Sequence, residues 1–69
     1  MSQLALTING EGRVVPGPAT VQELLERLGL DPRAIVVELN RRIVRRPEIG
    51  RTPLQDGDVL ELVHFVGGG

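Results

Sequence analysis

The chain has 69 residues, a net charge of −1 and no cysteine. A chain of this length forms one small domain that buries only about 60% of its unfolded surface, so its stability should be modest. The charge argues against a nucleic-acid partner, and the missing cysteines exclude a disulfide framework, a thiolate metal site and a cysteine nucleophile. Because no apolar run resembles a signal peptide or could span a membrane, we expect a cytoplasmic protein without a membrane partner.

The first stretch predicts a β-hairpin. Residues 3–8 alternate in the manner of a strand with one buried face. Asn9-Gly10 is suited to the positive φ angles of a tight turn, and residues 13–15 should form the returning strand. Pro16 lacks an N–H group, so it should end that strand or confine it to the edge of a sheet.

A helix is predicted between Thr20 and Gly29. Thr20 is a suitable N-cap, and Glu23 three residues later completes a capping box. Gly29 is placed to end the helix. The apolar residues at helical spacing should form its core face: Val21, Leu24, Leu25 and Leu28.

The second half of the chain predicts three more strands. Residues 34–39 are rich in β-branched side chains, and residues 42–45 should be their hairpin partner at a sheet edge. Residues 48–54 have no clear period and are interpreted as a loop or a short 3₁₀ turn. After a turn at residues 55–58, the last strand should begin at Val59.

This order predicts an α+β domain over residues 1–65, with one helix covering one side of a sheet. The first and last strands should lie near the centre, and the second and fourth at the edges. Alternation in the last strand assigns Leu60 and Leu62 to one face, and Val63 and Phe65 to the other. We predict that Val63 and Phe65 form an exposed apolar patch that contacts a partner. The alternative is that Phe65 folds back over the sheet edge.

Two polar features have plainer interpretations. His64 is the only histidine, and we interpret it as a solvent-facing strand residue rather than a catalyst or metal ligand. Four arginines fall within six residues, and they are interpreted as a solvated strand edge: Arg41, Arg42, Arg45 and Arg46. A patch for an acidic protein surface or for RNA is the alternative, and the lack of stacking aromatics makes RNA the weaker of the two.

The chain continues after Phe65 as Val66-Gly67-Gly68-Gly69. Glycines add nothing to a core, but backbone without a Cβ atom can pass close to another surface. The carboxyl group of Gly69, with a reference pKa of about 3.5, is ionised at neutral pH and available as a nucleophile. Residues 66–69 are therefore interpreted as a flexible tail that presents this carboxylate, and a frayed terminus without function is the alternative.

Taken with this tail, the order of elements resembles the ubiquitin-like β-grasp sulfur carriers, and within them the sulfur carriers of thiamine biosynthesis, the ThiS family. The matching segments are Ile8-Asn9-Gly10-Glu11, Thr20-Val21-Gln22-Glu23-Leu24-Leu25, Val37-Glu38-Leu39-Asn40, Thr52-Pro53-Leu54, Asp56-Gly57-Asp58 and Val63-His64-Phe65-Val66-Gly67-Gly68-Gly69. Arg41 departs from the smaller residue that family members often have there. The molybdopterin-synthase small subunits share the Gly-Gly end but usually approach it through a proline, which residues 63–66 lack.

The resemblance implies a β-grasp fold with a mixed sheet of about five strands, and a carrier that is not itself an enzyme. An E1-like enzyme would use ATP to adenylate the carboxylate of Gly69, and a sulfur donor such as a cysteine desulfurase would convert it to a thiocarboxylate. Thiazole synthase would then receive the sulfur. Gly67 and Gly68 would thread into the partner and Val66 would contact it, and no metal or bound cofactor is expected. A molybdopterin-type carrier and a non-covalent β-grasp interaction module remain alternatives.

Overall fold

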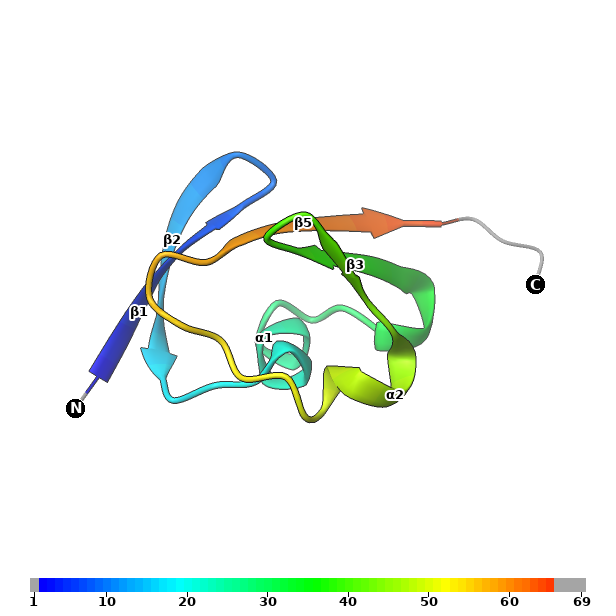
Figure 1. Ribbon diagram of the computed structural model, residues 1–69, viewed down its shortest axis with the longest axis horizontal. Helices are drawn as coiled ribbons and strands as arrows, with labels where there is room; N and C mark the ends of the chain where they lie inside the picture. Colours follow the sequence, from blue (N-terminus) through cyan, green and yellow to red (C-terminus); the bar gives the residue numbers. More distant parts are fainter. Residues whose placement is uncertain (1, 66–69) are drawn as a thin grey trace.

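A mixed five-stranded sheet in the order β2-β1-β5-β3-β4 forms the body of the computed structural model, which describes residues 2–65 (Figure 1). Both helices lie on the same side of this sheet. The elements are β1 (Ser2–Ile8), β2 (Glu11–Gly17), α1 (Val21–Arg27), the 3₁₀ turn η1 (Pro32–Ala34), β3 (Ile35–Leu39), β4 (Arg42–Val44), α2 (Arg46–Ile49) and β5 (Val59–His64).

The last strand, β5, lies at the centre of the sheet. It runs parallel to β1 on one side, where Thr7 is opposite Val59, and antiparallel to β3 on the other. β2 and β4 are the edges. The predicted α+β fold, the inner positions of the first and last strands, and both edges are therefore confirmed.

The returning strand β2 is longer than the sequence indicated. Pro16 lies inside β2, opposite Gln3 of β1, and does not end the strand. Because β2 is an edge strand, a residue without an N–H group can be accommodated there. The turn between the two strands has positive φ angles at Asn9 (51°) and Gly10 (83°), as the Asn-Gly pair predicted.

The sequence signals at both ends of α1 are confirmed. The Thr20 side chain accepts a hydrogen bond from the Glu23 N–H at 3.2 Å, and the Glu23 carboxylate accepts one from the Thr20 N–H at 2.8 Å. At the other end, the Gly29 N–H donates to the Glu26 carbonyl at 3.0 Å, and the Leu30 N–H donates to the Leu25 carbonyl at 2.8 Å. This pair of bonds is a Schellman motif, which requires the positive φ of 74° found at Gly29.

The segment interpreted as a loop or 3₁₀ turn is different in the structure. A single α-helical turn, α2, spans Arg46–Ile49, and Pro47 in its first turn has the fixed φ angle that suits a helix start. Ile49 is 4% exposed and Leu54 is 6% exposed, so both belong to the core. The sequence prediction missed them because each segment contributes one buried residue, which leaves no periodic pattern.

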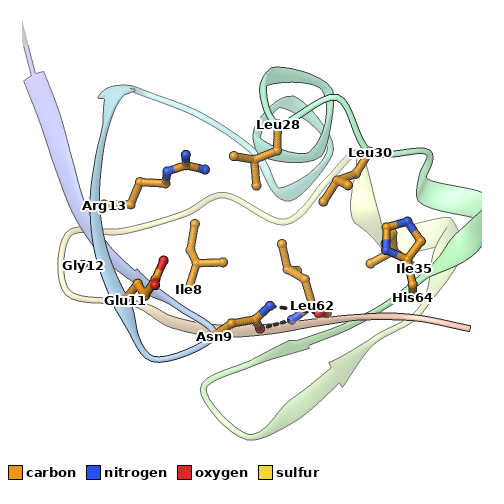
Figure 2. A pocket seen from close by; sticks show the side chains of 10 residues that line it. All are labelled: Ile8, Asn9, Glu11, Gly12, Arg13, Leu28, Leu30, Ile35, Leu62 and His64. Carbon is orange, nitrogen blue, oxygen red and sulfur yellow. Dashed lines mark hydrogen bonds between the residues drawn. The ribbon is translucent and has the colours of Figure 1, made fainter.

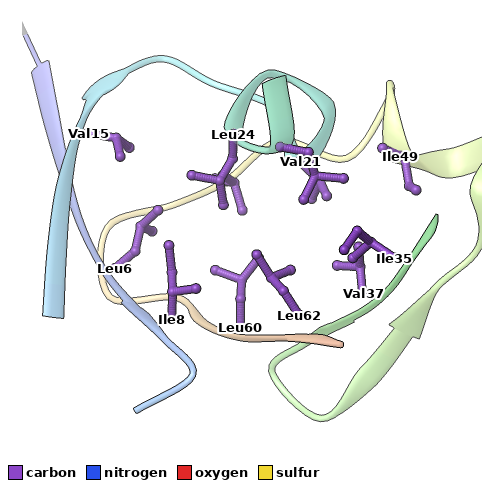
Figure 3. Close-up of a cluster of buried hydrophobic side chains, with 12 residues drawn as sticks. Leu6, Ile8, Val15, Val21, Leu24, Ile35, Val37, Ile49, Leu60 and Leu62 are labelled. Atoms are coloured by element: carbon purple, nitrogen blue, oxygen red, sulfur yellow. The ribbon is translucent and has the colours of Figure 1, made fainter. Parts of the chain in front are cut away.

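The core lies between α1 and the sheet, and Figure 3 shows its side chains pointing into this layer from both sides. Leu25 and Leu60 are completely buried, and among the described residues no polar or charged residue is buried. Leu28 and Val44 pack against the core without being fully buried. The buried residues are Leu6, Ile8, Val15, Val21, Leu24, Leu25, Ile35, Val37, Ile49, Leu54, Leu60 and Leu62.

Candidate partner-binding face and tail attachment

No helix of the described chain covers the face of the sheet opposite α1 and α2 (Figure 1). Val63 is 55% exposed and Phe65 is 45% exposed, so the predicted exposure of both residues is confirmed. We call this surface the open face. Strand register and alternation along the strands place six exposed apolar residues there: Val14, Val36, Ile43, Val59, Val63 and Phe65.

Two glutamates lie in the middle of the open face. Glu38 of β3 is directly opposite Glu61 of β5, and its other neighbour across the sheet is Ile43 of β4. Both glutamates line a shallow hollow of about 470 Å³ that also includes Arg41 and Val59. The sequence could place each glutamate on the outer face by alternation, but their direct opposition depends on the register between distant strands.

Within residues 2–65 there is one ion pair, and it does not involve the open face. It joins Asp31 and Arg33 at 3.0 Å. Hydrogen bonds from Arg33 lower the pKa of the Asp31 carboxyl below its ordinary value. The carboxylates of Glu38 and Glu61 have no such partner among the described residues. The negative charge at the centre of the open face is therefore not neutralised by a neighbouring side chain.

Asn9 holds the final strand from the β1 side. β1 ends at Ile8, and the Asn9 side chain continues the hydrogen-bond ladder in place of a further strand residue. Its Nδ2 donates to the Leu62 carbonyl at 3.1 Å, and its Oδ1 accepts from the Leu62 N–H at 2.8 Å (Figure 2). A primary amide offers the donor and the acceptor that a peptide group would offer. The sequence identified the Asn-Gly turn, but not this contact with a strand 53 residues away.

Asn40 holds the start of the same strand from the β3 side. Its Oδ1 accepts from the Val59 N–H at 2.9 Å, and its backbone N–H donates to the Val59 carbonyl at 2.7 Å. Its Nδ2 also donates to the Asp58 carboxylate at 2.9 Å. The turn has positive φ at Asn40 (51°) and at Arg41 (71°), a conformation that is uncommon for arginine. The two hairpin turns therefore fix β5 from opposite sides.

A cavity of about 370 Å³ lies on the helix side, between the β1–β2 hairpin, the end of α1 and β5 (Figure 2). Leu28, Leu30 and Leu62 are among its apolar walls. Figure 2 shows Arg13 and His64 on opposite sides of this cavity, so they do not form a joint catalytic group. His64 is exposed, as predicted.

The last described residue before the tail is anchored to the sheet. The Phe65 N–H donates to the Ala34 carbonyl at 3.2 Å, which extends the pairing of β5 with the β3 side. The predicted roles of Val66, Gly67, Gly68 and Gly69 fall outside the described residues and stay predictions. Partner contacts by Val63 and Phe65 likewise stay predictions, although their exposure leaves them accessible.

The arginine cluster is exposed to solvent, as the interpretation of a solvated strand edge requires. All four clustered arginines are exposed on β4, the preceding turn and the start of α2: Arg41, Arg42, Arg45 and Arg46. Over residues 2–65, no group of three or more histidine, aspartate or glutamate residues is arranged to hold a metal ion. In the same part of the chain, no helix has the length and apolar character needed to cross a membrane.

One main helix on a mixed five-stranded sheet, with an open apolar face that leads to the tail, defines a ubiquitin-like β-grasp protein. The family model for the ThiS family matches residues 6–69 of the chain. The chain therefore belongs to the ThiS family, as the sequence resemblance predicted.

Individual relatives agree with this assignment. The chain is 39% identical over 62 residues to the sulfur carrier protein ThiS of Thermus thermophilus, covering 90% of this chain and 95% of that one. The crystal structure of the thiamine biosynthesis protein ThiS from Geobacter metallireducens has a TM-score of 0.82 and 36% identity. That likeness covers 96% of this chain and all of the other.

A third relative is much longer. The chain is 44% identical over 66 residues to a thiazole synthase of Paramagnetospirillum magneticum, a match that covers 96% of this chain. The chain spans only 20% of the length of that protein. A segment similar to this chain thus occurs in proteins named thiazole synthase as well as in separate small proteins named sulfur carriers.

Proposed function

We propose that this protein is a sulfur carrier of thiamine biosynthesis that transports sulfur as a thiocarboxylate on Gly69. The observation that carries the proposal is the family match, which continues through the glycines to residue 69. The relative from Thermus thermophilus, named a sulfur carrier, supports it because the similarity covers nearly the whole length of both chains. The same comparisons favour the thiamine branch over a molybdopterin-type carrier.

The proposed chemistry takes place at the tail, in the active sites of partner enzymes. A carboxylate oxygen of Gly69 attacks the α-phosphorus of ATP, releasing pyrophosphate and forming an acyl-adenylate. A persulfide sulfur from a donor such as a cysteine desulfurase then displaces AMP and forms an acyl disulfide. A thiol attacks the donor's sulfur in this S–S bond, forms a mixed disulfide with the donor and releases the thiocarboxylate. The folded domain therefore acts as a protein co-substrate, and ATP is bound by the E1-like partner.

The attachment of Phe65, the last described residue before the tail, supports this role. Phe65 is fixed to the sheet by its bond to Ala34, so the tail begins from a defined point next to the open face. The four residues 66–69 can extend about 14 Å, enough to enter a buried active site while the domain stays outside. Thiazole synthase is the proposed acceptor, and the relative of that name supports it because it contains a segment similar to this chain.

Intact mass spectrometry tests the proposal directly. The protein is incubated with ATP, an E1-like adenylating enzyme, a cysteine desulfurase, cysteine and a thiol. If the carboxylate of Gly69 is free, exchange of one oxygen for sulfur at this ionised group raises the mass by about 16 Da. Omission of ATP is the control and should leave the mass unchanged. If the complete mixture with ATP gives no increase in the mass of the protein, the non-covalent interaction module is favoured instead.

Tail variants locate the reacting group. Deletion of Gly69 should abolish thiocarboxylate formation, because it moves the carboxylate by about 3.5 Å in the activating site. Gly68→Val should also fail, since a branched side chain would clash in a channel that fits bare backbone. Gly67 should tolerate substitution best, being nearest the channel mouth. Thermal melts of all variants should match the wild type, and thiocarboxylation of the deletion variant at the wild-type rate would contradict the carrier role.

A further inference from the structure

The opposed glutamates of the open face are unfavourable for the isolated domain. Glu38 and Glu61 occupy directly opposite positions on neighbouring antiparallel strands. Side chains in such positions have Cβ atoms about 5 Å apart, and like charges there destabilise the sheet. No described side chain forms an ion pair with either carboxylate. Folding alone therefore gives no reason for two carboxylates at this position.

The surroundings of the two carboxylates indicate what they could bind. Along β5, Glu61 lies between Val59 and Val63, which are 45% and 55% exposed on the same face. Across the sheet, Ile43 is opposite Glu38. The negative pair is thus surrounded by apolar side chains. A protein that covers this apolar surface must also cover the glutamates and remove their water.

Removal of water from an unpaired carboxylate is costly, whereas a paired and hydrogen-bonded carboxylate is tolerated. We propose that the open face binds a partner enzyme whose surface presents an arginine or lysine side chain within an apolar patch, and that this cation lies between Glu38 and Glu61. The proposal rests on the proposed function, because the partner is the enzyme that handles the tail, and Phe65 joins the open face to the tail.

Arg41 is the internal competitor for this position. It lines the same hollow as the two glutamates, but it forms no ion pair with them among the described residues. A partner cation supplied from above the face can approach both carboxylates at once. The proposal therefore predicts that loss of the glutamates weakens the complex, and that loss of Arg41 does not.

The test measures binding to the E1-like adenylating enzyme and to thiazole synthase by titration calorimetry, at low and high ionic strength. The double variant Glu38→Gln/Glu61→Gln should bind at least one of them about tenfold more weakly than the wild type, with a smaller salt dependence. Glu11→Gln is the control for position, because it removes one negative charge, against two in the double variant, from the helix side of the sheet. Its affinity should equal the wild-type value, whereas Arg41→Ala, which removes the internal competitor, should bind at least as tightly as the wild type.

Glu61→Val separates a charge contact from a purely apolar one. If the face binds only through apolar contact, this variant extends the patch and binds more tightly. The proposal predicts weaker binding. Thermal melts of the glutamate variants should show no loss of stability. A double variant that binds both enzymes as well as the wild type, or that binds weakly only because it is less stable, overturns the proposal.

The experiments distinguish failure of the sulfur-carrier function from failure of the proposed cation contact. If the wild type binds an enzyme in a glutamate-dependent way but never gains sulfur, the proposed function fails and the cation contact stands. If the wild type gains sulfur but the double variant reacts with an unchanged KM, the cation contact fails and the carrier role stands. If the wild type binds neither enzyme, both are wrong.

Discussion

Leu24 is one of the buried residues that pack α1 against the sheet. It is 1% exposed, and its neighbour Leu25 is completely buried. Leu24→Ala should cost about 2–5 kcal/mol in the free energy of unfolding, because it removes buried methyl groups and leaves a cavity. A domain of this size has little stability to lose, so the variant should be partly unfolded at room temperature.

Urea denaturation followed by circular dichroism measures this loss. Gln22→Ala is a suitable control on the same helix, since Gln22 is exposed and its amide donates one side-chain hydrogen bond, to the Glu26 carboxylate at 3.2 Å. Its effect should stay within about 0.5 kcal/mol. An unchanged denaturation midpoint for Leu24→Ala would contradict the assignment of this residue to the core.

Asn9 should contribute to stability although it is polar and exposed. Asn9→Asp keeps an oxygen that can accept from the Leu62 N–H, but it places a carboxylate oxygen opposite the Leu62 carbonyl, where Nδ2 donated. The part-buried carbonyl then loses its partner, which should destabilise the domain by about 1–3 kcal/mol. Hydrogen exchange at the Leu62 amide should also become faster.

Asn9→Gly is the companion variant, because glycine accepts the positive φ of 51° without strain. It removes both side-chain bonds and should also destabilise the protein. If both variants unfolded at the wild-type urea concentration, the side-chain ladder at Asn9 would contribute no stability.

The environments of individual residues could be predicted from the sequence only in part. The alternation of β5 correctly predicted that Leu62 is buried and that Val63 and Phe65 are exposed. It could not predict the amide ladder of Asn9, or the opposition of Glu38 and Glu61. Both depend on the register between strands that are far apart in the chain, and no local pattern encodes it.

The Schellman motif at the end of α1 supports a prediction at the scale of an element. Gly29→Ala should destabilise the protein by about 1–2 kcal/mol, because a residue with a Cβ atom is strained at a positive φ angle. No atom lies within 4 Å of the added Cβ, so the cost comes from the backbone alone.

Gly12→Ala is the matched control for this variant. An added Cβ at Gly12 also meets no atom within 4 Å, and Gly12 has no positive φ. Its effect should stay within about 0.5 kcal/mol in the same chemical denaturation experiment. Equal stabilities for the two alanine variants would show that the conformation of Gly29 does not limit stability.

The helices and strands whose start, apolar spacing and end are all marked in the local sequence were predicted correctly. α1 has a capping box, a regular apolar spacing and a terminal glycine, and all three are present in the structure. α2 has only a proline in its first turn and one buried side chain, Ile49. A helix of a single turn depends on contacts with the rest of the fold for its stability, so its own sequence could not reveal it.

The two faces of β5 lead to a prediction for the whole molecule. Leu62, 9% exposed, faces the core, whereas Phe65, 45% exposed, belongs to the open face. Leu62→Ala should lower stability by about 2–5 kcal/mol. Phe65→Ala should cost less stability, but it should raise the KM for the protein as a substrate of the adenylating enzyme.

Thermal melts and steady-state thiocarboxylation of the two variants provide the comparison. Since Leu62 does not face the partner, any folded Leu62→Ala protein should react with a nearly normal KM. If Phe65→Ala is the less stable of the two variants, the assignment of the faces is reversed.

The architecture of the whole molecule was predicted correctly from the number and order of elements. One helix with a single apolar face can cover only one side of a sheet, which requires two layers and leaves the other side open. The order of strands within the sheet needed more than local patterns. Pro16 and the arginine-rich strand indicated the two edges, and this placed the remaining strands inside.

The central place of β5 also has a consequence for how the protein is made. Among the described elements β5 leaves the ribosome last, yet it is the strand that joins β1 to β3. Until it emerges, the two halves of the sheet have no common neighbour, and the apolar side of α1 has no complete surface to cover. Folding should therefore follow synthesis of the domain, because the parallel pairing needs contacts across almost the whole chain. Nascent chains stalled before Val59 should be digested rapidly by protease, and chains stalled well beyond the tail should resist it.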